Sequence, residues 1–443
     1  MGLGATGRSG DAERYGLFNC YESYRGLSTT GGGARSRCWK ASTLDKLSED
    51  GGRVIRSSFK KQQWLYLVAF PAGHGAVDWG SGALWLLAPA MAVSMGLSPL
   101  QVGILFAARQ IASGIAQLPA GLIGDNLSGR GNFLLGTFWL VSASQLIASG
   151  STNYWVVVGF LTLASAGAAA WHPVAMGAMA QWMPDRKGFV IAIHMTGGTI
   201  AEIAAPLLVG VLLMSMDWNL VLQINTVPTI ILGLIFLRLA PMVTVPPKES
   251  GIGLNITDLA KSIVRPGVLA ILLMIILHNM SMVAFMSMAP LYFQEVRGVS
   301  SGLTGLGFSL FLIGGAVAAP FVGHVSDKVG RKTMATWGLI GGGICAWFIT
   351  FAPSDVTIFP LLIVTGLLML AIRSVIVAMA LEKIGNREST VLGLISSVGE
   401  GFAALGAVLA GILGDMALEF PLILAAILSI LAGLAIWPLN RNS

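Results

Sequence analysis

The sequence is short of charge and of cysteine. Only 11% of its 443 residues are charged whereas 55% are hydrophobic, a balance that excludes a soluble globular domain. Its three cysteines, Cys20, Cys38 and Cys345, form no C-x-x-C pair, so we expect neither a disulfide framework nor a zinc site. An H-E-x-x-H helix, a nucleophile elbow and a phosphate-cradling loop are also missing, which argues against a membrane enzyme. We therefore expect no metal and no cofactor.

Long apolar segments take the place of the missing charge. From Trp64 onward, each segment approaches the length of about 20 residues that a membrane helix needs. We predict twelve spans, near residues 64–92, 99–123, 132–150, 154–180, 188–213, 219–240, 267–293, 302–325, 333–352, 356–381, 390–413 and 419–438. The expected fold class is an all-α membrane protein with twelve transmembrane helices in two parallel six-helix bundles.

The two sets of six spans repeat one another. At an offset of about 201 residues, Pro89 aligns with Pro290. The same shift aligns His172 with Arg373. Parallel repeats of this kind place a substrate site near the bilayer midplane, at the interface of the repeats. We predict four regions: a disordered cytoplasmic tail at 1–60, which is polar and lacks apolar periodicity, a bundle at 61–240, a cytoplasmic linker at 241–266, and a second bundle at 267–443.

The net charge of +6 reflects basic residues that are concentrated in alternate loops between the predicted spans. Basic residues such as Arg186 and Lys187 fill alternate loops, whereas the intervening loops hold acidic residues such as Asp217 and Asp415. Lys and Arg are retained on the cytoplasmic side of a membrane. We therefore expect a multi-pass protein of the inner cell membrane with both termini in the cytoplasm. This placement favours a lipid bilayer as partner and no nucleic acid, and we expect a monomer.

Two polar loops share one pattern of residues. Gly323-His-Val-Ser-Asp-Lys-Val-Gly-Arg-Lys332 follows the eighth span, and Gly121-Leu-Ile-Gly-Asp-Asn-Leu-Ser-Gly-Arg130 follows the second. Each contains an aspartate four residues after a glycine, then a turn glycine, which enters positive φ without steric cost, then an arginine. The pattern resembles the signature loop of the major facilitator superfamily of transporters. The first copy departs from it, because Asn126 replaces the base and one extra residue follows. The resemblance implies gating roles for Asp125, Arg130, Asp327, Arg331 and Lys332.

Ionisable residues also fall near the middle of the predicted spans. A charge near a bilayer centre costs several kcal/mol and is rarely kept without a use. A structural ion pair is the alternative interpretation for any one of them, and it is less favoured for eight at one depth. His194 lies nearer the cytoplasmic end of its span and His324 lies in a loop, and we expect structural roles for both. The eight are His74, Asp78, Arg109, His172, Glu202, His278, Arg373 and Glu400.

Carboxylates and arginines at this depth suit different tasks. A spacing of four residues places His74 and Asp78 on one helix face, where they can share a proton. We expect Asp78, tuned by His74, to carry a coupling proton, with Glu202 and Glu400 as rivals. Arginine stays charged and offers a planar fork that suits a carboxylate or phosphonate. We assign substrate binding to Arg109, Gln110, His172, His278 and Arg373.

Four motifs in chain order narrow the resemblance to the fosmidomycin-resistance-type exporters, a branch of this superfamily. Two departures, Arg109 and Glu202, stand where the branch carries uncharged side chains, and they suit a more anionic substrate. Ala205 replaces a glycine of the superfamily's antiporter motif, so the antiport signal is partial. The resemblance covers about residues 64–420. The motifs are His74-x-x-x-Asp78, Gln110-Ile-Ala-Ser113 with Gln117, Trp171-His172-Pro173, and Gly197-Gly198 with Pro206.

These features favour a secondary active transporter that moves a small organic solute by alternating access, with proton-coupled export by antiport. Two alternatives remain. One is uptake of an organic anion by proton symport. The other is a sensor or assembly protein that keeps the transporter fold and moves no solute.

Overall fold

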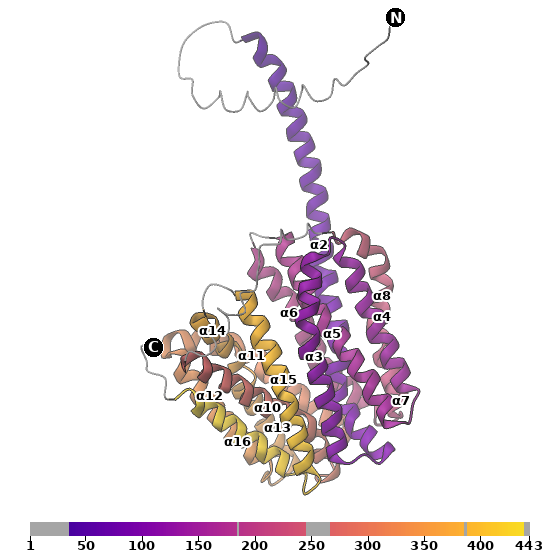
Figure 1. Ribbon diagram of the computed structural model, residues 1–443, viewed down its shortest axis with the longest axis vertical. Helices are drawn as coiled ribbons and strands as arrows, with labels where there is room; N and C mark the ends of the chain where they lie inside the picture. Colours follow the sequence, from indigo (N-terminus) through magenta and orange to yellow (C-terminus); the bar gives the residue numbers. More distant parts are fainter. Residues whose placement is uncertain (1–34, 184–185, 245–265, 385–387, 438–443) are drawn as a thin grey trace, which may run out of the picture. The chain divides into compact units, whose positions relative to one another are not determined.

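The computed structural model describes residues 35–183, 186–244, 266–384 and 388–437, with side chains from Trp64 onward except at Asp125, Pro266 and 383–395. Two compact units divide the chain, one that ends at Leu65 and one that covers Tyr66–Ser443. All regular structure in these ranges is helical. Both sets of six spans thus belong to the second unit, and Figure 1 shows its helices.

The first helix is longer than the sequence predicts. α2 runs from Arg35 to Met95, so the prediction of a disordered tail at 1–60 does not hold for the backbone of residues 35–60. No proline occurs between Arg35 and Phe70, and proline is the residue that most strongly interrupts a helix. Residues 1–34 lie outside the described part of the chain, as does most of the predicted linker.

The remaining helices follow the predicted spans closely. The first half continues with α3 (Pro99–Asn126), α4 (Arg130–Ser149), α5 (Tyr154–Trp182), α6 (Lys187–Leu212), α7 (Trp218–Asn225), α8 (Val227–Leu239) and the short η2 (Ala240–Met242). The second half contains α10 (Pro266–Glu295), α11 (Ser301–Val329), α12 (Arg331–Ile349), α13 (Asp355–Met369), α14 (Ile372–Ile384), α15 (Glu388–Gly414) and α16 (Phe420–Ala435).

Two spans are built from broken helices. Pro228 starts α8 and separates it from α7, because proline suits the first turn of a helix better than its interior. The second break, at Leu370 and Ala371 between α13 and α14, has no proline beside it. It falls directly before Arg373, in the middle of the span Asp355–Glu382.

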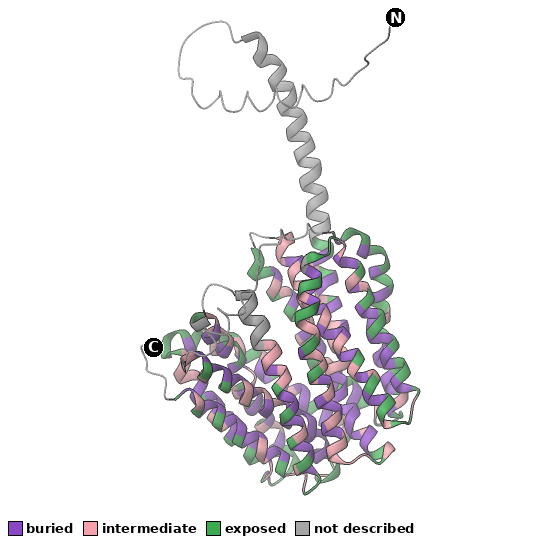
Figure 2. Cartoon of the chain, in the orientation of Figure 1, coloured by how far each residue is buried: buried purple, intermediate pink, exposed green. Residues whose placement is uncertain are grey.

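The composition of the helices suits a bilayer. Within the described residues, nine spans are long and apolar enough to cross a membrane. α3, α12 and the shorter α16 complete the predicted twelve. Large apolar side chains such as Phe321 and Val356 are more than 70% exposed, and Figure 2 shows exposed residues along the outward faces of the helices. Such surfaces contact lipid, so the chain is a multi-pass integral membrane protein.

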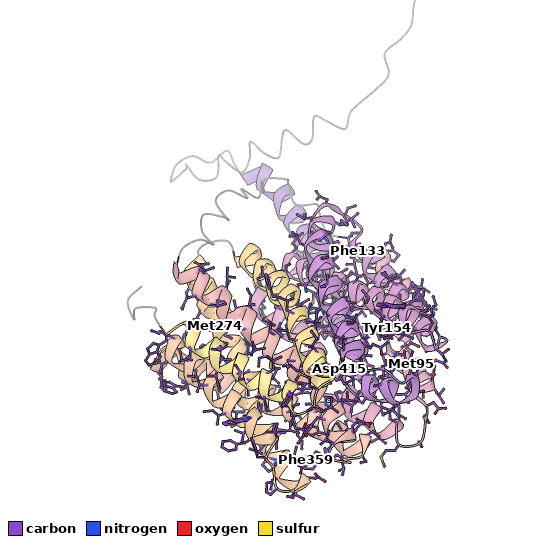
Figure 3. All side chains as sticks on the ribbon, turned by 60° about the horizontal axis from the view of Figure 1, so that its bottom comes forward. Met95, Phe133, Tyr154, Met274, Phe359 and Asp415 are labelled. Carbon is purple, nitrogen blue, oxygen red and sulfur yellow. The ribbon has the colours of Figure 1, made fainter. Side chains whose placement is uncertain are left out.

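Two helix pairs join the halves. α3 packs along α15, and α6 packs along α11 (Figure 1). Ser301 Oγ donates to the Gly210 carbonyl at 3.0 Å, and the Leu100 amide donates to Asp415 Oδ1 at 3.0 Å. These bonds lie at the end opposite the two signature loops, and Figure 3 labels Asp415 there. The halves are therefore tightly joined at that end.

A bulky residue at Gly210 should open this junction. A Cβ atom there would overlap the Ser301 carbonyl oxygen and touch Gly305. Overpacking costs about 1–3 kcal/mol, which would shift a balance between two conformations about 5- to 150-fold. We expect Gly210→Leu to increase cysteine labelling from the end opposite the signature loops and to slow transport. Gly159→Leu is the control, since a Cβ at Gly159 meets nothing within 4 Å. Equal labelling of the two variants would contradict the prediction.

Candidate functional site: an ionisable cluster at mid-span

A carboxylate held by two histidines lies at the middle of the first half. His74 Nε2 is 2.9 Å from Asp78 Oδ2, and His172 Nε2 is 3.2 Å from Asp78 Oδ1. The side chains of His74, Asp78 and His172 are 3%, 15% and 24% exposed, so accessibility rises from α2 towards α5. The predicted pair on one face of α2 is therefore formed, with His172 as an added partner.

The contacts of His74 restrict where hydrogens can lie in this pair. His74 Nδ1 lies 2.8 Å from the backbone carbonyl oxygen of His194, which can only accept, so Nδ1 donates. A neutral His74 then has an Nε2 that can only accept. The contact with Asp78 therefore requires either a charged His74 or a protonated Asp78. His172 Nε2 must likewise carry a hydrogen when Asp78 is ionised. The cluster can thus hold a proton that moves between imidazole and carboxylate.

Close helix approach brings these side chains together. A Cβ atom at Gly198 would lie 2.5 Å from His74 Nε2, and one at Gly197 would overlap the Pro71 carbonyl oxygen. The two glycines thus let α6 approach α2. On α5, Trp171 is fully buried with its ring centre 4.7 Å from that of Phe138. This packing fixes α5 where His172 can reach Asp78.

His194 supports the orientation of His74. It is fully buried, and its ring stacks on that of His74 with centres 4.3 Å apart. Its depth near the end of its span led to the expectation of a structural role, and its carbonyl oxygen does hold His74 in orientation. That contact involves the backbone, so no side-chain pattern in the sequence could reveal it.

Two charged residues, one from each half, interact electrostatically at mid-span. Glu202 on α6 and Arg373 on α14 lie at mid-span and are nevertheless solvent-exposed. Glu202 interacts electrostatically with Arg373 and also with Asp78. Intramembrane charges normally face the bundle interior or a water-filled cavity. This tendency favours an inward orientation for both side chains.

Two more predicted residues interact electrostatically with this group of charges. His278 on α10 is 3% exposed and interacts electrostatically with Arg373. Glu400 on α15 is half-buried and interacts with His172 across the halves. Within the described residues, His278 Nδ1 and Glu400 Oε2 are buried without a hydrogen bond. Seven of the eight mid-span residues thus belong to one network, which we call the central cluster.

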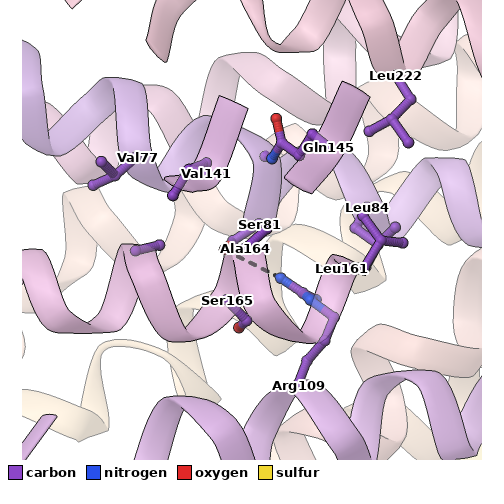
Figure 4. Close-up of a pocket in the computed structure, with 12 residues that line it drawn as sticks. Val77, Ser81, Leu84, Arg109, Val141, Gln145, Leu161, Ala164, Ser165 and Leu222 are labelled. Carbon is purple, nitrogen blue, oxygen red and sulfur yellow. Dashed lines mark hydrogen bonds between the residues drawn. The ribbon is translucent and has the colours of Figure 1, made fainter. Parts of the chain in front are cut away.

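Arg109 is the exception. It lines a pocket whose walls come from α2, α3, α4, α5 and α7, all in the first half (Figure 4). We call this the Arg109 pocket. No residue of α14 lines it, so the structure does not bring Arg109 and Arg373 to one space. Gln110, which follows Arg109 on α3, is half-buried and lies outside the pocket.

Three histidines beside Asp78 are the best candidate for a metal site among the described residues. Ring nitrogens of His74, His172 and His194 lie within 4.8 Å of one another. Ligands of one tetrahedral zinc ion, at about 2.0 Å from the metal, would be closer together. Asp78 already engages His74 and His172. The expectation of no metal remains a prediction.

The second signature loop makes side-chain contacts within its own half, and its gating role remains a prediction. Gly330 has a φ of 97°, which confirms the turn glycine. Arg331 Nη2 lies 3.1 Å from Asp327 Oδ1 and 3.2 Å from Glu382 Oε1, so it ties together α11, α12 and α14. Lys332 Nζ donates to the Trp437 carbonyl at 2.7 Å. Glu382 is the partner that the sequence analysis missed.

The first signature loop differs. Gly129 has a φ of −94°, so the prediction of a positive-φ turn glycine is wrong here, because the extra residue lets the loop turn without one. Asn126 Nδ2 donates to the Leu122 carbonyl of its own helix at 2.8 Å. Arg130 is only 1% exposed, with Nη1 close to Gly177 of α5. The Asp125 side chain lies outside the described part, so gating by this loop remains a prediction.

Removing the charge of Asp327 should change the balance of conformations and leave the fold intact. The pair with Arg331 is exposed, and exposed pairs contribute about 0–1 kcal/mol. We expect Asp327→Asn to alter cysteine labelling at the two ends of the molecule. Asp355→Asn is the matched control, since Asp355 pairs with Arg297 at 3.4 Å at the other end of the same half. Unchanged labelling in Asp327→Asn would refute the latch.

In the described part of the chain, twelve helical spans in two related halves around a central cluster of charges define a membrane transporter. The model of the Major Facilitator Superfamily matches residues 72–308 and 271–442. The chain therefore belongs to this superfamily, whose members are transporters and not enzymes. The resemblance inferred from the sequence motifs is confirmed.

Relatives of known name agree with this assignment. The chain is 23% identical over 401 residues to the fosmidomycin resistance protein of Escherichia coli (strain K12), covering 88% of this chain and 97% of the relative. It is 22% identical over 315 residues to a probable nitrate/nitrite antiporter of Thermus thermophilus, covering 66% and 65%.

Solved structures share the fold. A bacterial homologue of the human lysosomal transporter Spinster, in its inward-facing and occupied conformation, superimposes with a TM-score of 0.70 at 15% identity, covering 85% of this chain and 96% of that one. The nucleoside transporter NupG gives 0.67 at 15% identity, covering 85% and 99%.

Proposed function

We propose that the protein exports a small organic solute with an anionic group in exchange for protons, across the inner cell membrane. The observation that carries the proposal is the contact of His74 and His172 with Asp78, in a cluster with charged residues of both halves. A proton carrier must be able to gain and lose a proton in response to solvent or substrate. Asp78 meets this requirement through His172, the most accessible member of the trio.

Arg373, His278 and His172 are the proposed ligands of the anionic group. Arg373 is permanently charged, and its planar fork suits a carboxylate or phosphonate. Glu202, in the other half, interacts electrostatically with it. A substrate anion would compete with Glu202 for Arg373, and protonation of the cluster would change that competition. Binding and protonation are thereby linked. Arg109 is left out of this set because its pocket is confined to the first half.

Export is proposed on the strength of the relatives. The superfamily relative that spans nearly the whole chain is named for antibiotic resistance, and a multidrug resistance protein of Yersinia enterocolitica is 32% identical over 135 residues, covering 29% of this chain and 32% of its own. The basic loops favour a cytoplasmic location for both termini. The halves are joined at the opposite end, which suits loading of substrate from the cytoplasm.

Flux through proteoliposomes tests the function. Ligands are first selected by their effect on the thermal unfolding of the purified protein, from fosmidomycin, other organic anions and neutral solutes of similar size. We expect a ligand that stabilises the protein to be driven across the membrane by a pH gradient, with protons moving in the opposite direction. Movement of both in one direction would indicate symport. A stabilising ligand that is never moved would indicate a sensor.

A further inference from the structure

The charge of Arg109 has no counter-ion in the described part of the chain. Arg109 is 6% exposed. Its Nη2 donates to Ser81 Oγ at 3.2 Å, and its guanidinium carbon lies 5.8 Å from the centre of the Phe106 ring. Asp78, the carboxylate on the facing helix, is engaged by two histidines. Asp125 lies sixteen residues along the same helix, about 24 Å away.

An isolated charge in this position is expensive. The effective cost of burying an ion is several kcal/mol, and arginine does not lose its proton in proteins. The ring of Phe106 and the hydroxyl of Ser81 each offset a part of this cost. A guanidinium has five N–H donors, and most of those on Arg109 remain available. The arrangement therefore favours a further acceptor that carries negative charge.

The Arg109 pocket provides a place for such an acceptor. Figure 4 shows Arg109 reaching towards Ser81, with Ser165 on one side and the Gln145 amide on the other. Gln145 Oε1 is buried and, in the described structure, has no hydrogen-bond donor. Turning the amide would offer its NH2 group instead, because the two orientations have nearly the same shape. The remaining walls are apolar.

The size of the pocket limits what can bind. The cavity volume that the centre of a water-sized molecule can occupy is about 10 Å³. This is close to the minimum for one water molecule. An organic acid does not fit, whereas a single monatomic ion does with small side-chain adjustments. We propose that the Arg109 pocket binds one halide-class anion, with chloride as the probe, as the counter-ion of Arg109 inside the first half. This site is separate from the central cluster.

Equilibrium binding of radioactive chloride to the purified full-length protein tests the site. Gluconate, which is too large for the pocket, keeps the ionic strength constant. We expect one saturable site per chain, displaced by bromide and unaffected by gluconate. Arg109→Gln should abolish saturable binding and the chloride-dependent rise in thermal unfolding temperature. Arg297→Gln is the matched control and should keep both, because Arg297 lies at the end of α10 and pairs with exposed Asp355.

A second variant keeps the test valid if Arg109→Gln fails to fold. Gln145→Leu retains the charge and removes a polar wall, and we expect it to weaken chloride binding about tenfold, as loss of one hydrogen bond to a charged group would. Absence of saturable chloride binding to the unmodified protein would mean that the pocket holds water only. Saturable binding that survives in Arg109→Gln would place the site elsewhere. Either result overturns the inference, and neither depends on whether the protein transports.

Discussion

Asp78→Asn is expected to abolish accumulation of substrate against a gradient while leaving exchange of substrate for substrate intact. In the unmodified protein, each proton that crosses a pH difference of one unit supplies about 1.4 kcal/mol, enough for about a tenfold concentration ratio. Asparagine keeps the shape of the side chain and can still contact His74 and His172, but it binds no proton. The predicted ratio in Asp78→Asn liposomes is therefore about 1, measured with labelled substrate at a fixed pH gradient.

A carboxylate outside the central cluster provides the control for Asp78→Asn. Asp217→Asn, in the turn before α7 and at its N-cap position, should concentrate substrate like the unmodified protein. Accumulation by Asp78→Asn would show that the coupling proton resides elsewhere. Glu202→Gln and Glu400→Gln would then be the next variants, because both carboxylates interact with His172.

The fold was predictable because its dominant signal is local. Apolar runs of membrane length determine each span, and the helix ends lie close to the predicted limits. The break between α13 and α14 was not predictable in this way, since no proline or glycine marks Leu370 and Ala371. The helical extension of α2 back to Arg35 was missed for a related reason. Composition alone does not distinguish a polar helix from a polar tail.

The site was predictable only in part, for geometric reasons. His74 and Asp78 are four residues apart, so helix geometry alone brings them together. The contact of His172 with Asp78 depends on how α5 packs against α2. The Trp171-His172-Pro173 motif identifies His172 as a candidate but does not show that Asp78 is its partner. Arg109 and Gln110 point about 100° apart on α3, as adjacent residues of a helix do. The position of each residue along its span could be predicted from the sequence. The direction in which each side chain points could not, because it depends on how the helices pack.

Arg373→Gln is expected to weaken binding of an anionic substrate about 10- to 150-fold, since hydrogen bonds to charged groups contribute about 1.5–3 kcal/mol. The affinity of Arg373→Lys should lie between those of the unmodified protein and Arg373→Gln, because lysine keeps the charge and loses the planar fork. Arg109→Gln should leave the affinity for the organic anion nearly unchanged when measured at constant chloride. Affinity is measured by thermal unfolding or calorimetry with a ligand already shown to stabilise the protein.

An exchange of charges separates substrate binding from a purely structural role of Arg373. Its interaction with Glu202 could itself hold the halves together. In that case the double variant Arg373→Glu with Glu202→Arg would restore both stability and transport, because the pair would be formed again. If Arg373 binds the substrate anion, the double variant moves the positive charge to α6, away from His278. Binding should then stay weak even where the fold recovers, and full recovery of transport would refute the assignment of Arg373.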